Sequence, residues 1–176
     1  LNYLHDELFS KIAKNVNHLV DGFKCQELSM IVHGFAKVGK VDVSLFDVVE
    51  AELAMSADYF KPMEITNVTW AYSKQNISES KVFDIVQKQL YERISMFNPH
   101  ELAIVVWSFS NVKKNIPGLF LLLAKQLISG VDKLRPNELS IISYAYSNMD
   151  LNCNILFESI SPFITYKIKE FNAVEL

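Results

Sequence analysis

Residues 60–73 read FKPMEITNVTWAYS, and this stretch decides the fold because its pattern returns along the chain. Ile65, Val68 and Tyr72 stand at positions i, i+3 and i+7, so they share one face of a helix with about 3.6 residues per turn. Pro62 suits the first helical turn, where its missing N–H costs nothing. Glu64, two residues later, can accept hydrogen bonds from the free N–H groups of that turn. The stretch therefore predicts a capped helix over residues 62–74.

The same pattern recurs every 37 residues without insertion or deletion, which is the signature of a repeat protein. The capping column reads Glu27, Glu64, Glu101, Glu138 and Glu175. An aromatic column reads Phe9, Phe46, Phe83, Phe120 and Phe157, and a second one reads Phe35, Tyr72, Phe109 and Tyr146. A second apolar stripe, over residues 79–94 in the second repeat, predicts a second helix in each repeat.

One helical hairpin cannot bury both of its apolar stripes, whereas stacked hairpins can. We therefore predict an all-α fold, a right-handed α-solenoid of tandem 37-residue helical hairpins. The predicted divisions are the second helix of a partial repeat at 1–22, repeats at 23–59, 60–96, 97–133 and 134–170, and the start of a further repeat at 171–176. We expect Pro162 to kink or shorten the last helix. No polar capping repeat is recognisable, so we expect the native protein to continue or partners to cover its ends.

The composition excludes several classes of protein. The 176 residues are 50% hydrophobic with five Gly and five Pro, which excludes disorder. A net charge of −3 excludes a uniformly basic nucleic-acid binder but not a local basic patch. Cys25 and Cys153 form neither a disulfide framework nor a metal-binding CxxC pair, so we expect a reducing or redox-indifferent compartment. The apolar stretches are far shorter than the roughly 18 residues of a membrane span, so no membrane partner is expected.

The side of each first helix opposite the apolar stripe carries planar rings, short amides and lysines. RNA-binding repeats use such a mixture, because rings stack on bases, amides bond base edges and lysines meet phosphates. We name these residues the candidate face. Its predicted RNA-binding residues are His33, Lys37, Asn67, Trp70, Lys74, Trp107, Asn111, Lys113, Lys114, Tyr144 and Asn148.

Structural roles compete with this interpretation. Trp70, Trp107 and Tyr144 could instead fill grooves between neighbouring first helices. Met30, Ile104 and Ile141 share the same side and favour packing, since exposing them to water is unfavourable. Lysines near helix C-termini also interact favourably with the helix dipole without any ligand.

Nothing in the sequence indicates catalysis, and we expect neither an enzyme nor a small-molecule substrate. The four histidines stand at no metal-ligand spacing, so no metal or cofactor is predicted. No phosphate-binding, dinucleotide-binding, zinc-protease or serine-nucleophile motif occurs.

The repeat, with its length of 37 residues and its core FKPMEITNVTWAYS at 60–73, resembles the heptatricopeptide repeat of apicomplexan organellar proteins. It is also similar to octotricopeptide and FAST-kinase-like repeats. The resemblance implies an organellar RNA-binding protein, mitochondrial or alternatively of a plastid (apicoplast). Many such proteins carry a C-terminal RAP domain, which this sequence does not contain.

The resemblance also implies the partners, which are rRNA or an organellar transcript together with neighbouring proteins of a ribonucleoprotein complex. Four repeats that each address one base would contact about four nucleotides. Such a short contact suits a structural component of a divergent mitochondrial ribosome that holds rRNA segments. The alternative is an α-solenoid scaffold that binds proteins within a large complex.

Overall fold

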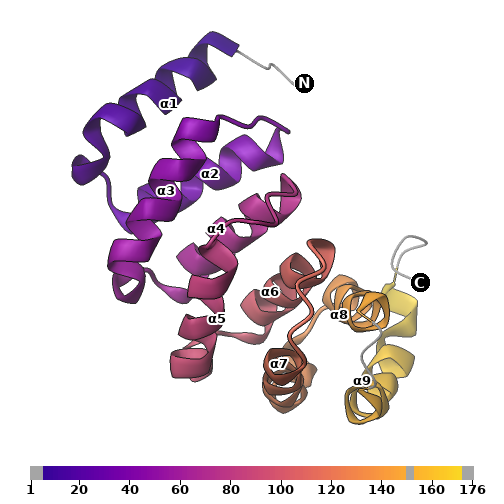
Figure 1. Ribbon diagram of the computed structural model, residues 1–176. Helices are drawn as coiled ribbons and strands as arrows, with labels where there is room; N and C mark the ends of the chain where they lie inside the picture. Colours follow the sequence, from indigo (N-terminus) through magenta and orange to yellow (C-terminus); the bar gives the residue numbers. More distant parts are fainter. Residues whose placement is uncertain (1–5, 150–152, 172–176) are drawn as a thin grey trace. The chain divides into compact units, whose positions relative to one another are not determined.

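A computed structural model describes residues 6–149 and 153–171, and these residues form helices and turns without any strand (Figure 1). The predicted all-α class is confirmed. The helices are α1 (Asp6–Leu19), α2 (Cys25–Lys37), α3 (Val43–Ser56), α4 (Pro62–Lys74), α5 (Val82–Arg93), α6 (Pro99–Asn111), α7 (Pro117–Ser129), α8 (Pro136–Asn148) and α9 (Asn154–Lys167). The predicted polar break at 150–152 and most of the predicted start of a repeat at 171–176 lie outside the described residues.

The helix boundaries follow the 37-residue period. Helices α2, α4, α6 and α8 each span 13 residues and begin 37 residues apart. Helix α5 begins later than the predicted residue 79, and Ser80 explains the delay. The Ser80 hydroxyl accepts a hydrogen bond from the Val82 amide (3.1 Å) and donates one to Glu50 (2.5 Å). Pro162 does not shorten α9, which at 14 residues equals α1 and α3, so that part of the prediction is wrong.

The capping glutamates hold the first turns of α2, α4, α6 and α8, as predicted. Glu64 accepts a hydrogen bond from the Lys61 amide at 2.8 Å, and Glu138 accepts one from the Arg135 amide at 2.7 Å. Glu101 does the same for Asn98, whose side chain in return accepts from the Glu101 amide at 2.9 Å. This reciprocal pair is the capping box that fixes a helix start.

The first helices α2, α4 and α6 also end alike, with one residue in the left-handed conformation. That residue is Gly39 after α2, Asn76 after α4 and Lys113 after α6, with φ of 73°, 56° and 58°. The amide that follows each of them bonds back to a carbonyl five residues earlier, as from Lys114 to Phe109 at 3.0 Å. These bonds form the Schellman motif, which satisfies carbonyls left open at the helix end.

The chain divides into two compact units, residues 1–89 and 90–176, with the boundary inside α5. In unit 1, α2 packs against α4 and α3, and α1 packs against α3. The Tyr72 ring of α4 lies on the Phe46 ring of α3, 5.0 Å between centroids, and its hydroxyl donates to the Phe46 carbonyl. First helices therefore contact first helices, and second helices contact second helices, within this unit.

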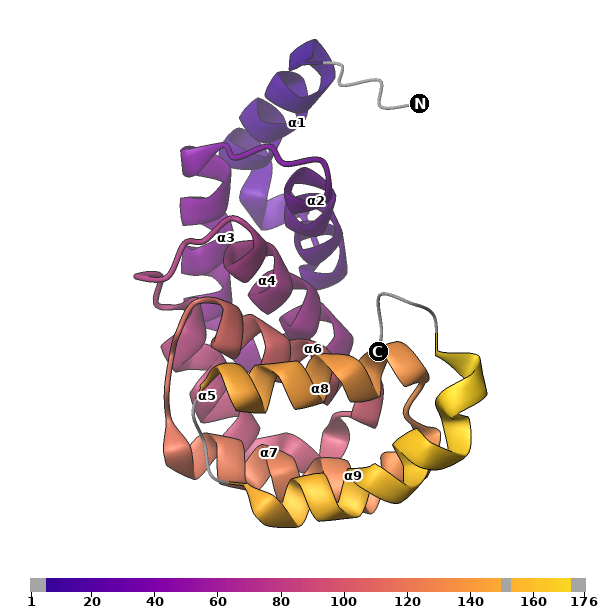
Figure 2. The ribbon, with the colours of Figure 1, turned by 90° about the vertical axis from the view of Figure 1, so that its right-hand side faces the viewer.

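Unit 2 repeats this packing (Figure 2): α8 runs beside α6, and α9 runs beside α7. The Tyr146 ring of α8 meets the Phe120 ring of α7 edge-on at 5.4 Å, and its hydroxyl donates to the Phe120 carbonyl at 2.7 Å. Gly130 marks a close approach, because a Cβ there would lie 2.5 Å from the Pro99 ring. Each unit thus places two neighbouring first helices side by side.

Candidate nucleic-acid interface

The candidate face lies on the outward sides of α2, α4, α6 and α8 and on the turn after α6. The apolar stripe of each helix faces the core, as Ile65 and Val68 do in α4, so the opposite side remains accessible. The exposed predicted residues are Lys37, Lys74, Asn111, Lys113 and Tyr144. The half-buried ones are His33, Asn67, Trp70, Trp107, Lys114 and Asn148.

In unit 1 the structure brings two predicted rings into contact. The His33 imidazole of α2 lies 4.6 Å from the Trp70 indole of α4, centroid to centroid, with the planes 36° apart. Both rings remain partly accessible to solvent. Trp70 therefore packs on the neighbouring first helix and still exposes part of its ring to a ligand.

The electrostatics of His33 favour its neutral form. Burial lowers the pKa of His33 below its usual value, and the nearby Lys37 cation lowers that pKa further. A neutral imidazole keeps the stack with Trp70 uncharged, while Lys37 and Lys74 supply positive charge at the ends of the same two helices. Unit 1 therefore combines an aromatic pair with two exposed cations.

Apolar side chains accompany this pair. Met30 and Met63 are each 60% exposed, and Ile104 in unit 2 is 36% exposed. The expectation that Met30 and Ile104 would be packed away is therefore wrong, although Ile141 is half-buried. Their side chains lie on the candidate side because their helical positions place them opposite the buried residues of α2 and α6. Exposed methionines beside rings suit a ligand with flat, weakly polar surfaces.

In unit 2 the two predicted rings differ in their exposure to solvent. Tyr144 of α8 is 62% exposed, so it does not fill a groove between helices. Trp107 of α6 is half-buried. A phenol ring this exposed is available to stack on a base without prior rearrangement of the fold.

In unit 2, a lysine and an amide of the candidate face are hydrogen-bonded to each other. The Lys113 ammonium donates to the Asn148 side-chain oxygen at 2.7 Å, and the Asn148 amide nitrogen donates to the Ser110 hydroxyl at 3.1 Å. Asn148 thus links α8 to the end of α6, and it would have to exchange these bonds to read a base. Lys113 is exposed at the surface, with its backbone in the left-handed conformation that favours glycine.

One contact, at the opposite ends of α6 and α8, was not predicted from the sequence. The His100 Nδ1 atom lies 2.7 Å from the carboxylate of Glu138, which also caps α8. The 38-residue spacing of these residues, one position more than the repeat, is the signal that could have found the pair. The contact fastens neighbouring helices and lies away from the helix ends that carry the lysines.

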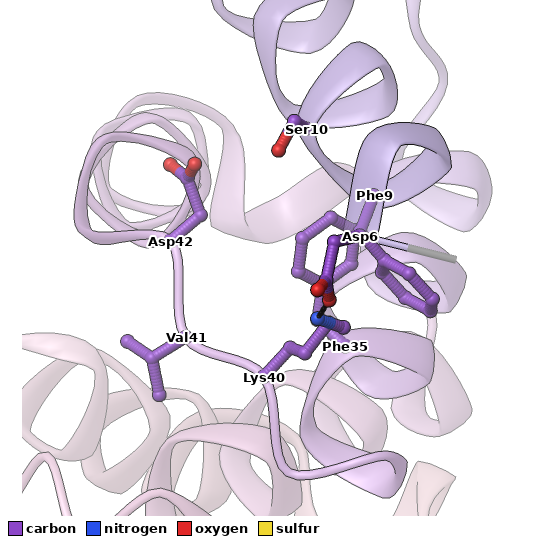
Figure 3. A pocket seen from close by; sticks show the side chains of 7 residues that line it. All are labelled: Asp6, Phe9, Ser10, Phe35, Lys40, Val41 and Asp42. Atoms are coloured by element: carbon purple, nitrogen blue, oxygen red, sulfur yellow. Dashed lines mark hydrogen bonds and ion pairs between the residues drawn. The ribbon is translucent and has the colours of Figure 1, made fainter. Parts of the chain in front are cut away.

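Figure 3 shows a separate hollow of unit 1, of about 230 Å³, where Lys40 reaches across to Asp6 beside the Phe9 and Phe35 rings. The Lys40 ammonium pairs with the Asp6 carboxylate and lies 5.4 Å from the centre of the Phe9 ring. Asp42 is engaged as well, because it caps α3 by accepting from the Leu45 amide at 3.0 Å. Lys40, Asp6 and Asp42 are thus engaged with one another or with the backbone of α3, and none of them belongs to the candidate face.

Two other kinds of site have no support in the described part of the chain. Among residues 6–149 and 153–171, no group of three or more His, Cys, Asp or Glu side chains could hold a metal ion. No helix within these ranges has the length and apolar character needed to cross a membrane.

Comparison with known proteins adds no family, because the sequence matches neither a protein-family model nor a curated protein. The resemblance to the heptatricopeptide repeat therefore rests on the repeat length and the residues quoted for it. The site itself must carry any functional conclusion.

Proposed function

We propose that this chain is an organellar RNA-binding helical-repeat protein that holds a single-stranded RNA segment against the candidate face. The carrying observation is the arrangement in each unit of accessible rings beside exposed lysines, with His33 and Trp70 in contact and Tyr144 62% exposed. Bases would stack on the rings, and the lysines would meet phosphates. The proposal includes the right-handed solenoid of 37-residue hairpins, supported by the packing of first helix on first helix and second helix on second helix within each unit.

The resemblance of the repeat extends this proposal to a place in the cell. It favours a structural component of a ribonucleoprotein, such as a divergent mitochondrial ribosome, in which the chain clamps an rRNA segment beside neighbouring proteins. A modest contact with RNA suits such a role, since a net charge of −3 provides little general attraction to phosphate.

The test is binding of a short fluorescent oligouridylate to the full chain, measured by anisotropy at about 50 to about 200 mM salt. Tyr144→Ala should weaken binding about 5-fold to 150-fold, because stacking of one base contributes about 1–3 kcal/mol. Lys74→Gln should lower the slope of log affinity against log salt by about 0.7. Both side chains are exposed, so neither change should unfold the chain.

Matched controls lie on second helices, away from the candidate face. Tyr166 of α9 is 84% exposed and Lys125 of α7 is exposed. Tyr166→Ala and Lys125→Gln should leave the affinity and its salt slope unchanged. Equal losses in both pairs, or absence of binding at the lowest salt, would refute the proposal.

A protein-binding scaffold is the second candidate, and the exposure of Met30 and Met63 favours it. Two exposed methionines on the helices that carry the ring pair could accept the apolar side of a partner helix. A photo-crosslinking amino acid at position 63 distinguishes the two functions in the native organelle. Attached nucleotides support RNA binding, and attached peptides support the scaffold.

A further inference from the structure

The last helix, α9, partly exposes side chains whose counterparts in the three preceding repeats are buried. Phe157, Ile164 and Phe171 are all only half-buried. Their counterparts one repeat earlier, Phe120, Leu127 and Leu134, are at most 1% exposed. The counterparts two and three repeats earlier are also buried: Phe83, Leu90, Phe97, Phe46, Leu53 and Phe60. The face of α9 that carries these residues is therefore more open than the same face of α3, α5 and α7.

Within each unit the structure shows what covers the aromatic member of this set. Tyr72 covers Phe46 in unit 1, and Tyr146 covers Phe120 in unit 2. Each covering residue follows 26 residues later in the chain and lies in the first helix of the next hairpin. In both cases the tyrosine hydroxyl donates to the carbonyl of the phenylalanine beneath it. Ring contact and hydroxyl bond together define one recurring way of covering this face.

The face of α9 is open enough to receive such a residue. A hollow of about 470 Å³ runs along the helix and is lined by Phe157, Glu158, Ile160, Ser161, Ile164 and Thr165. Ile168, just beyond the helix, is 45% exposed, whereas its counterpart Val131 is 7% exposed. The apolar surface thus continues from α9 into the following turn.

We infer that the open face of α9 docks a further helical hairpin of the same repeat type, whose first helix places a tyrosine on Phe157. The hydroxyl of that tyrosine donates to the Phe157 carbonyl, as Tyr146 does to Phe120. The second helix of the incoming hairpin packs on α9 as α9 packs on α7. This inference continues an interface already present in the chain and is independent of RNA binding.

The experiment extends the full chain in register. Because Leu176 corresponds to Leu139, residues 140–170 are copied directly after Leu176, which places a copy of Tyr146 26 residues after Phe157. Hydrogen exchange of the α9 amides is compared between the parent and the extended chain. Exchange should slow at least about 10-fold in the extended chain, because docking adds to the free energy of opening α9.

Changes confined to the added segment provide the controls and leave the parent fold intact. Replacing the copied tyrosine by Asp should abolish the protection, and replacing it by Phe should retain most of it. An unchanged exchange rate, or equal protection from an added segment of scrambled sequence, would overturn the inference. A parent chain that dimerises with α9 already protected would assign the face to a second copy and would overturn it as well.

Discussion

Removal of the Tyr146 hydroxyl is the most direct test of the packing between neighbouring hairpins. Tyr146→Phe removes one buried hydrogen bond of 2.7 Å to the Phe120 carbonyl and keeps the edge-on ring contact. Burial raises the pKa of Tyr146, so its hydroxyl stays protonated and remains a donor over the working pH range. A carbonyl inside a helix keeps its backbone N–H partner, so no unsatisfied acceptor remains.

The expected cost is therefore that of one neutral hydrogen bond, about 1 kcal/mol in the free energy of unfolding. In a chain of this length, that corresponds to a decrease of about 2–4 °C in Tm. The measurement is urea unfolding followed by circular dichroism, with Trp70 and Trp107 as additional fluorescent reporters. The slope of the free energy against urea should not change, because no surface is newly exposed in the folded state.

Two further variants make the result specific. Tyr166→Phe removes the same hydroxyl from a side chain that is 84% exposed, and it should change stability by less than about 0.5 kcal/mol. Phe35→Tyr is the reverse change, since the Phe35 ring already lies 4.8 Å from the Phe9 ring, and it should add stability. If Tyr146→Phe is as stable as the parent, or if Tyr166→Phe loses as much, the proposed role of the hydroxyl is wrong.

Other perturbations address single features of the fold. Gly130→Ala places a methyl group against the Pro99 ring and should cost about 1–3 kcal/mol in a urea titration. Lys113→Gly should raise the unfolding midpoint, because relief of the left-handed backbone is worth about 1 kcal/mol, whereas Lys113→Ala should bring no gain. Burial and Lys37 lower the pKa of His33, so the unfolded chain binds protons more readily near pH 6.5. Stability should therefore fall between about pH 7 and about pH 5, and His33→Gln should reduce that fall.

The sequence predicted the local structure well because local structure depends on neighbouring residues. The bounds of α4, the prolines in the first turns and the capping role of Glu64 and Glu101 follow from signals within a few positions of the chain. Asn98 is an N-cap for the same reason. Periodicity alone thus located the first helices and their apolar sides.

The candidate site could be predicted only in outline, because ring exposure depends on contacts between repeats. Trp70 and Tyr144 occupy the same column, yet Trp70 packs on His33 while Tyr144 stays exposed. Contacts with side chains of a neighbouring helix, such as that of Trp70 with His33, decide the exposure of a ring, and no short sequence pattern encodes them. The engagement of Asn148 by Lys113 has the same origin, since these residues are 35 positions apart.

The fit between Gly130 and Pro99 has a consequence for how such chains can diverge. A larger residue at position 130 is tolerated only if the ring at position 99 is lost or displaced. We therefore expect the two positions to covary among homologous chains, with a side chain appearing at 130 where proline is absent from 99. In a line of descent that keeps the proline, the glycine should be among the slowest positions to change.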